Sequence, residues 1–550
     1  MPDKEFNLLH EPWIMVMKHD GSTGEVSILD AFRHAHEYRS IAGELPTQDV
    51  AVLRLLLAIL HAVFGRVDTQ GQYAPLCEGD ADQALDRWES LWNAGQFPMQ
   101  PIERYLTNPK IEERFWLFHP ETPFYQVAAL ANNETVFGPF KVSKLNGDIL
   151  ESNGKARLFS SRAGNQKDTL SYSEAARWLL HVIGYAEDFG RLEQKGKKSK
   201  DDPSIGVGWL GKIGAIMANG HNLFTTLMYN FVLLKDGEEI WEAEHPVWEI
   251  DKNEVIKERN AISCPNNASE YLTNLPRQIL LFRNENKYVC EYCFLSGSFF
   301  PKEESFSEQF TIWRYSKDKD QGDKIEHFRP KTFESARQVW RGFGTFVAQG
   351  EGKRRPGVIR WLSLLREMNL INSPLITFKT SSPQYGTMSA SITDYACDSL
   401  TFYPTLLTNL GEAWCNKIID EICATDLLVK EVQSLAKNIA KSAGSEKGNG
   451  EYEEAGRQAY YALDMKFRNW LESLSIEADS ISQKCEEWWK IEQKIIRKQG
   501  KDLSQTASLN AFKGKADSTE KIKPKSLAEA YNYFLFKTSS KENLLKGGKK

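Results

Sequence analysis

Two cysteines separated by two residues, Cys290 and Cys293 in the stretch CEYC, form the only close thiol pair in the chain. Thiolates at this spacing can share one zinc ion, but a closed structural site needs four ligands. Cys264 or His327 would have to complete the set. The pair therefore indicates either a structural zinc at Cys290 and Cys293 or two cysteines of a core strand or turn.

His327 follows the cysteine pair in the stretch IEHFRPK. A CxxC followed by a strand-borne Glu-His-x-x-Pro resembles the start of an HNH endonuclease, whose histidine activates water beside a bound metal. The later asparagine and the second histidine or CN pair of that pattern are missing from the next 60 residues. The enzymatic alternative for this protein is thus an HNH-type metal-dependent DNA endonuclease using Cys290, Cys293 and His327.

Motifs of several other catalytic classes are absent. The sequence has no GxxxxGK[ST] loop, no GxSxG and no HExxH, which disfavours a P-loop ATPase and offers no serine-hydrolase or zincin motif. It also lacks a dense carboxylate cluster of the kind that two-metal nucleases use.

Glycines recur in the stretch SIGVGWLGKIG, at positions 206, 208, 211 and 214. Glycine permits a positive φ and lets backbone N–H groups approach a phosphate or a groove wall closely. Trp209 lies inside this stretch, where an aromatic side chain either anchors the loop or stacks on a ligand. The pattern predicts a loop that makes backbone contacts, and a plain glycine-rich turn before a helix is the alternative.

Basic residues concentrate at the C-terminal end of the chain. Residues 494–550 carry 14 basic and 5 acidic side chains, whereas the whole chain has a formal net charge of −5. Such asymmetry indicates a polyanionic partner for the basic end, or else a solvated lysine-rich tail.

Length and composition bound the class of protein. A chain of 550 residues with 41% hydrophobic and 26% charged residues predicts two to four folded domains. The most apolar stretch, residues 50–64, is interrupted by Arg54 and His61, so we expect no membrane span and no membrane partner. The start MPDKEF lacks the features of a signal peptide, and eight cysteines are too few for a disulfide scaffold, which together predict a cytoplasmic protein with reduced thiols.

The elements that must position these residues follow from hydrophobic spacing. Alternating Trp13, Met15 and Met17 before DGSTG predict a β-hairpin, and apolar residues at helical spacing after Thr47 predict a helix that Thr47 caps. Beyond about Leu400 the chain reads as amphipathic helices, over residues 406–424, 427–439, 454–474, 478–498 and 527–536. We predict an α+β fold, with a large mixed α/β domain over residues 1–397 and an all-α, four-helix-type bundle over residues 398–550.

Several segments, in order along most of the chain, resemble the CasA family. These segments are FNLLHEPWIMV and TQDVAVLRLLLAILHAVFG near the start, then ETPFYQV, ARLFSSR, NGHNLFTTLMYN, SPLITF and YGTMSASITDYACD, and finally EYEEAGRQAYYALDMKFRNWLE. That family is the large subunit of Cascade, the type I-E CRISPR surveillance complex. The resemblance implies a subunit without a catalytic centre or cofactor that reads the protospacer-adjacent motif on double-stranded DNA and starts duplex opening.

The resemblance also implies partners. It implies a guide RNA that reads the target by base pairing, the target duplex and its displaced strand, and the other Cascade subunits (backbone, small and 5′-handle-binding). It further implies recruitment of the CRISPR helicase-nuclease in antiviral defence.

Residue roles carry over from the family to matching positions. ARLFSSR resembles the loop that contacts the 5′ handle of the guide RNA, with Phe159 as its aromatic and Ser160, Ser161 and Arg162 as its polar contacts. The glycine stretch resembles the loop that presses its backbone into the DNA minor groove, where the donor and acceptor code is degenerate. This implies DNA contacts at Gly206, Gly208, Trp209, Gly211 and Lys212, together with Lys302 after the cysteine pair.

The family also has a hairpin whose tip glutamine wedges into the duplex. Aligning ASITD places that tip at residues 386–389, where Ser389 occupies the glutamine position. Met388 offers an apolar wedge instead, since such side chains insert between base steps in other proteins. Gln384 would serve if the hairpin were shifted. On the basic helical tail, Lys494, Arg497 and Lys498, together with Lys501, would contact phosphates without sequence preference.

Overall fold

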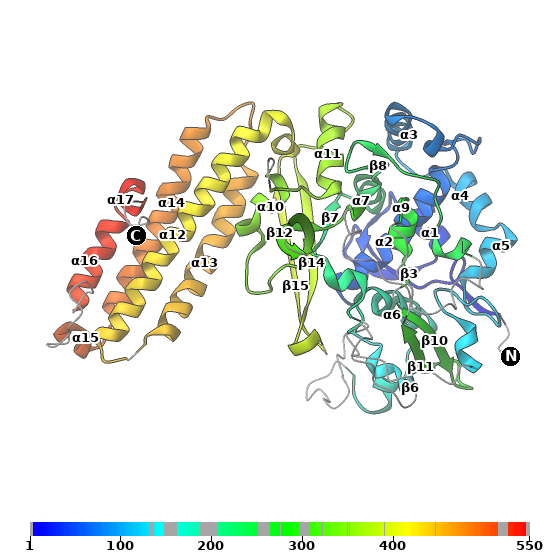
Figure 1. Cartoon of the computed structure of the whole chain (residues 1–550), viewed down its shortest axis with the longest axis horizontal. Coiled ribbons are helices and arrows are strands. Elements are labelled where there is room, and N and C mark those ends of the chain that lie inside the picture. Colours follow the sequence, from blue (N-terminus) through cyan, green and yellow to red (C-terminus); the bar gives the residue numbers. More distant parts are fainter. Residues whose placement is uncertain are drawn as a thin grey trace. The chain divides into compact units, whose positions relative to one another are not determined.

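The chain divides into two compact units. The computed structural model describes residues 4–132, 137–147, 162–187, 206–250, 265–275, 277–296, 307–320, 323–348, 350, 352–389, 391–445, 447–514 and 526–545 (Figure 1). Unit 1 comprises Met1–Arg337, Gln349–Asn372 and Ile376–Ser399, and unit 2 comprises Gln338–Ala348, Ser373–Leu375 and Leu400–Lys550. Two short segments that precede residue 398 therefore belong to unit 2.

Unit 1 combines helices with several small sheets, and its described helices and strands confirm the α+β class. The sheets join β1 (Glu5–Asn7) to β5 (Trp116–Phe118); β2 (Ile14–Lys18) to β3 (Thr23–Val26) and β4 (Tyr38–Ile41); β11 (Val289–Ser296) to β10 (Arg277–Arg283) and β6 (Phe137–Lys141); β12 (Ile312–Asp320) to β13 (Asp323–Lys331); β14 (Ile376–Tyr385) to β15 (Ile392–Phe402) and β7 (Ala215–Asn219); and β8 (Leu234–Lys235) to β9 (Glu239–Ile240). Its helices are α1 (Ile28–Arg33), α2 (Pro46–Phe64), α3 (Ala81–Ala94), α4 (Met99–Leu106), α5 (Pro109–Glu112), α6 (Tyr172–Tyr185), α7 (Leu223–Asn230), α9 (Ala268–Thr273) and α11 (Gly357–Glu367).

Helix α2 forms the centre of unit 1, because almost every one of its side chains is buried. Among the described helices it alone is long and apolar enough to cross a membrane, and here it lies within the protein core. The cap predicted for it was wrong: Leu45 precedes the helix, Pro46 occupies its first turn, and the Thr47 hydroxyl instead lies 3.0 Å from Nε2 of buried His181. Proline suits the first turn because its missing N–H would have no helical partner.

Unit 2 is built around four helices, α12 (Glu412–Ser442), α13 (Asn449–Glu472), α14 (Ile481–Gln505) and α16 (Leu527–Lys537), which pack on one another (Figure 1). Its core includes aromatic rings, with Phe467 edge-on to Trp488 at 5.1 Å between centroids. Helix α12 is continuous where we predicted two helices, since no glycine or proline interrupts it. The short helices α10 (Gly344–Val347), α15 (Leu509–Lys513) and α17 (Lys541–Leu545) complete the unit. The predicted helical C-terminal region is confirmed.

Candidate nucleic-acid interface

The glycine segment (residues 206–214) is built on the last turn of α6. That helix begins with a reciprocal cap, in which Ser171 and Glu174 each bond to the other's backbone N–H. At its end, the Gly208 N–H donates to the carbonyl of Ala186 at 2.9 Å. A Cβ at Gly208 would lie 2.3 Å from the Gly184 carbonyl oxygen, so this close backbone packing requires glycine.

Trp209 anchors the glycine segment inside unit 1. Its ring is only 7% exposed, and its Nε1 donates to Oε2 of Glu308 at 2.7 Å. This fits the anchoring alternative, and a stacking contact between Trp209 and DNA, which would require the ring to leave this partner, stays a prediction. Gly211 is buried as well, with the Tyr385 hydroxyl 2.2 Å from where a Cβ would lie.

The surface of the glycine segment is supplied by Gly206, which is half-buried, and by Lys212, which is exposed. Gly206 has φ +67°, and no atom lies within 4 Å of the place where a Cβ would be. Its carbonyl accepts a hydrogen bond from Nη2 of Arg277, which also donates to the Glu187 carbonyl at 3.1 Å. The structure thus gives Gly208 and Gly211 a packing role and leaves Gly206 and Lys212 as the accessible part.

The hairpin tip (residues 386–389) joins the long strands β14 and β15 (Figure 1). The Gly386 N–H donates to the Ser391 carbonyl at 2.8 Å, and the Ser389 N–H to the Gly386 carbonyl at 2.9 Å. Met388 and Ser389 both have positive φ, 56° and 55°, which is uncommon for residues other than glycine. The Met388 side chain is 86% exposed, so a left-handed turn holds a large apolar group out in solvent.

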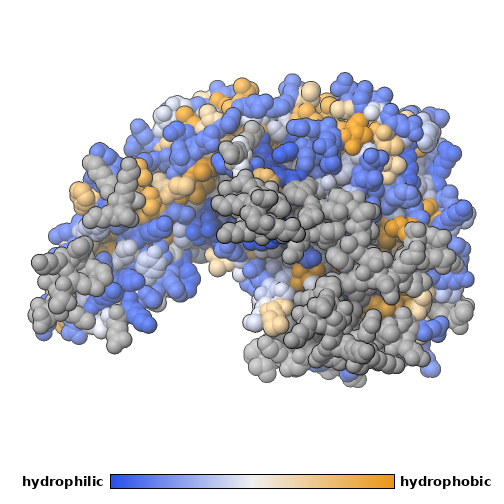
Figure 2. Space-filling model, in the orientation of Figure 1, coloured by the Kyte–Doolittle hydropathy of each residue, from blue (hydrophilic) through white to orange (hydrophobic). Residues whose placement is uncertain are grey.

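The other wedge candidate, Gln384, is anchored away from the tip. Its side chain is half-buried, and its amide donates to the backbone carbonyl of Phe333. The surface shown in Figure 2 is mostly hydrophilic, with hydrophobic side chains in small separate patches. Among the described residues, Met388 is the most exposed large hydrophobic side chain.

The structure brings together two features that were predicted separately. Tyr385 ends β14 beside the hairpin tip, packs against Gly211 and donates its hydroxyl proton to the Tyr185 carbonyl at 2.8 Å. The carboxylate of Glu187 accepts from the Ile392 N–H at the start of β15 at 2.9 Å, and burial raises its pKa. The end of α6 therefore binds both the glycine segment and the base of the hairpin.

Of the residues predicted to contact the guide RNA, Arg162 is the one that lies within the described part. Its guanidinium forms an ion pair with Glu174 in the first turn of α6, and this partner lowers the pKa of the Glu174 carboxyl against the effect of burial. Phe159, Ser160, Ser161 and the DNA-contact candidate Lys302 lie outside the described residues.

The basic residues predicted on the C-terminal helices fall on α14, where they divide into two kinds. Lys494 and Lys498 are exposed one helical turn apart. Arg497 is half-buried, and it donates to the Thr538 hydroxyl and the Leu535 carbonyl, both at 3.3 Å. Arg497 thus joins α14 to the end of α16, and the phosphate contact predicted for it stays a prediction.

The cysteine pair lies on strand β11. Its pairing with β10 shifts register between Phe282 and Arg283, which leaves Cys290 in a bulge with its thiol 3.6 Å from the Phe282 carbonyl oxygen. Cys293 packs in an apolar cluster with Val127 and Leu130, and burial raises its pKa to about 11. Strand β13, which carries His327, belongs to a different sheet. The described residues contain no group of three potential ligands, and Cys264, one of the residues named to complete a zinc site, lies outside them. The HNH alternative is not supported.

Sequence reasoning missed the residues that hold this interface together, namely Glu308, Arg277, Glu187 and Tyr385. One signal was present: Arg54 interrupts an apolar helix, and a buried charge requires a partner. Nη1 and Nη2 of Arg54 donate to the two carboxylate oxygens of Glu308, at 2.9 Å and 3.0 Å.

Comparison with protein families gives a match to CRISPR-associated protein Cse1 (CRISPR_cse1) over residues 7–503. A curated relative, the CRISPR-associated protein CasA/Cse1 of Thermus thermophilus, is 34% identical over 247 residues, which are 45% of this chain and 42% of the relative. That alignment therefore spans less than half the length of the curated relative.

The fold is shared with solved structures over nearly the whole chain. Thermobifida fusca Cse1 superposes with a TM-score of 0.80 and 26% identity, covering 98% of both chains. A chain of a CRISPR RNA-guided surveillance complex superposes with a TM-score of 0.62 and 16% identity, covering 91% of this chain and 100% of that one. At that level of identity the second likeness shows the fold alone.

Proposed function

The chain belongs to the CRISPR-associated protein Cse1 family, also named CasA, and we propose that it is the non-catalytic large subunit of a type I-E Cascade complex. In this proposal unit 1 reads the protospacer-adjacent motif in double-stranded DNA and starts duplex opening. Base pairing to the guide RNA reads the rest of the target.

The observation that supports this function most strongly is the joint mounting of the glycine segment and the hairpin on one helix end. Tyr385 contacts both α6 and Gly211, so the accessible backbone at Gly206 and the exposed Met388 belong to one supported assembly. The glycine segment would lie along the minor groove, with Lys212 near phosphates, and Met388 with Ser389 would insert between base steps. Because the glycine segment and the hairpin are held by the same helix end, binding of one to the duplex would position the other against it.

Electrostatics support the remaining contacts. Lys494 and Lys498 on α14 of unit 2 are exposed and would bind the displaced strand through its phosphates. Arg162, with the preceding residues 159–161, would contact the 5′ handle of the guide RNA, and Lys302 would add a contact to the DNA. At the RNA the Arg162 guanidinium would exchange the carboxylate of Glu174 for a phosphate.

The partners follow from this role. We expect the chain to assemble in the cytoplasm with a guide RNA and with the backbone, small and 5′-handle-binding subunits, and to recruit the helicase-nuclease in antiviral defence. The role needs no cofactor.

Target binding by the assembled complex tests the proposal. Duplexes that match the guide and differ only in the flanking bases should bind with different affinities, and the difference should vanish when this subunit is left out. Indifference of the full complex to the flanking bases would overturn the proposal. When the complex is incubated with plasmid and Mg²⁺ but without the helicase-nuclease, we expect no DNA cleavage. Cleavage that is lost in His327→Ala would instead favour the nuclease alternative.

A further inference from the structure

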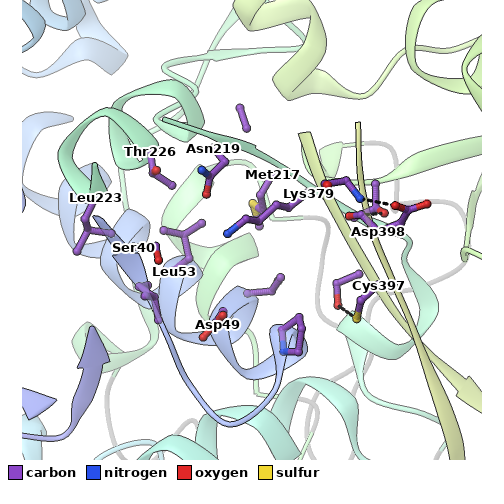
Figure 3. A pocket seen from close by; sticks show the side chains of 17 residues that line it. Ser40, Asp49, Leu53, Met217, Asn219, Leu223, Thr226, Lys379, Cys397 and Asp398 are labelled. Atoms are coloured by element: carbon purple, nitrogen blue, oxygen red, sulfur yellow. Dashed lines mark hydrogen bonds between the residues drawn. The ribbon is translucent and has the colours of Figure 1, made fainter. Parts of the chain in front are cut away.

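Unit 1 contains a cavity of about 320 Å³ away from the glycine segment and the hairpin tip (Figure 3). Its walls come from β4, α2, β7, α7 and the middle of the β14–β15 hairpin. The apolar part of the lining consists of Ile41, Pro46, Val50, Leu53, Met217, Ala218 and Leu223. Such a wall favours an aliphatic group over a polar one.

Two oppositely charged side chains enter this cavity from different walls (Figure 3). Lys379 extends from β14, where it lies opposite Met217 of β7 in the strand register, and Asp49 comes from the first turn of α2. Each could neutralise the other, but no hydrogen bond or ion pair joins them. Within the described part of the chain, the Lys379 ammonium has no protein acceptor, and Asp49 accepts one hydrogen bond, from the Gly43 N–H at 2.7 Å.

The charge of Lys379 nevertheless affects the pKa of Asp49. Burial raises the pKa of Asp49 to about 6, while the Gly43 N–H and the positive charge of Lys379 act in the opposite direction. At neutral pH the carboxyl is therefore mostly ionised. The cavity thus presents the ammonium of Lys379 and the carboxylate of Asp49, each able to form further hydrogen bonds, beside an apolar wall. A second carboxylate in the lining, that of Asp398, accepts a hydrogen bond from the Ser399 N–H at 2.7 Å.

We propose that this cavity binds a small zwitterion with an aliphatic body, of the chemical class of the free amino acid leucine. The ligand carboxylate would pair with Lys379, the ligand ammonium with Asp49, and the aliphatic group would lie against Leu53, Val50 and Met217. A ligand without an ammonium would cover the Asp49 carboxylate without giving it a partner, which costs free energy, and a ligand without a carboxylate would lose the ion pair with Lys379. The site is independent of the proposed DNA contacts.

Cys397 supplies a built-in reporter for this site. The thiol lines the cavity, lies 3.7 Å from the Ser381 hydroxyl and is exposed. Bound ligand should slow its alkylation by iodoacetamide, measured by peptide mass spectrometry. Cys77 is also exposed but lies outside the cavity, so its alkylation rate is the internal control.

Three probes with the same branched aliphatic group separate the two charges. We expect leucine to bind the full chain in calorimetry and to protect Cys397 but not Cys77. Isocaproate lacks the ammonium, and 3-methylbutylamine lacks the carboxylate. The affinity of each should be lower than that of leucine by a factor of about ten or more. No binding of leucine at millimolar concentration, or equal binding of isocaproate, would overturn the proposal.

Variants test the two charged residues. Lys379→Met and Asp49→Asn should each weaken leucine binding by about tenfold or more. Lys110→Met, an exposed lysine on α5, should leave it unchanged. Lys379 is exposed at the cavity rim, so its variant should keep the thermal unfolding of the wild type. Unchanged affinity in folded Lys379→Met would contradict the assigned contact.

Discussion

Trp209 and Glu308 are joined by a 2.7 Å hydrogen bond in the interior of unit 1. Glu308 also accepts two hydrogen bonds from Arg54 of α2 and one from the Phe310 N–H at 3.1 Å. One buried carboxylate thereby links the core helix to the ring that anchors the glycine segment. A fully bonded buried carboxylate holds its partners in one arrangement, and loss of a partner leaves a costly unsatisfied group.

Trp209→Phe should loosen the glycine segment without unfolding unit 1. The variant removes the indole donor but leaves the Arg54–Glu308 pair, so we expect a loss of about 1–2 kcal/mol in the free energy of unfolding. Hydrogen exchange of residues 206–214 should become faster. Trp116→Phe is the control, since Trp116 is half-buried on β5. Equal exchange in wild type and Trp209→Phe would contradict the anchoring role.

Substitution of Gly206 separates backbone strain from DNA contact. A Cβ there meets no atom, so any strain comes from φ +67°, which asparagine tolerates and valine does not. Gly206→Val should cost about 1–2 kcal/mol of stability, and Gly206→Asn much less. In the assembled complex both should weaken binding to motif-bearing duplex, because both add a side chain between backbone and groove.

Gly21→Asn is the matched control for Gly206. Gly21 also has positive φ, +84°, and open space around a Cβ, but it lies in the β2–β3 turn. This variant should alter neither stability nor DNA binding. Unchanged affinity in both Gly206 variants would remove Gly206 from the interface.

Met388 should act through its apolar side chain. Met388→Asn keeps a residue that accepts the left-handed turn but removes the apolar group, whereas Met388→Leu keeps that group. We expect duplex opening, followed by 2-aminopurine fluorescence beside the motif, to slow about tenfold in Met388→Asn and little in Met388→Leu. Leu410→Asn, another exposed apolar residue, should change nothing. Equal rates in all four proteins would place the wedge elsewhere.

Salt dependence should distinguish the lysines of α14 from Arg497. Changing Lys494 and Lys498 to Gln together should reduce the slope of log affinity against log salt by about 1.4 if both contact single-stranded phosphates. Changing the exposed Lys417 and Lys466 should leave the slope unaltered. Arg497→Gln should instead lower the thermal stability of unit 2, because it loses its contacts with the end of α16. An unaltered slope in the Lys494 and Lys498 variant would mean that these lysines belong to a solvated tail and do not contact phosphates.

The stability of unit 2 should depend on pH through Glu492. Burial between the helices raises the pKa of Glu492 to about 8, nearby Glu421 adds to the rise, and the Thr425 hydroxyl at 2.5 Å and Lys541 oppose it. The folded state therefore binds a proton that the unfolded state releases above its ordinary value near 4.5. Stability contributed by this proton is present below about pH 5 and is lost as the pH rises to about 8.

Glu492→Gln removes this titration. The thermal midpoint of unit 2 should then fall less between about pH 5 and pH 8 than in the wild type. Glu486→Gln, at an exposed position of the same helix, serves as the control. A wild type whose midpoint is flat over this range would show that the carboxyl is not protonated in the fold.

Local spacing in the sequence determined much of the architecture. Amphipathic periodicity alone located the helices that became α13, α14 and α16, and the apolar spacing after Thr47 located α2. This works because the helical period is a local property, and burial of one face selects the same residues in any compact arrangement. The same local pattern could not show that α12 is one helix rather than two.

The roles of the site residues were decided by the tertiary structure. Glycine spacing and an exposed hairpin were visible in the sequence, but their junction at the end of α6 depends on Tyr385, some 200 positions beyond its partner Tyr185. Trp209 and Arg497 were recognised as residue types able to contact nucleic acid, yet each satisfies a distant partner inside its own unit. A side chain's type fixes which bonds it can form, whereas burial and the neighbours that only folding supplies decide which of them it does form.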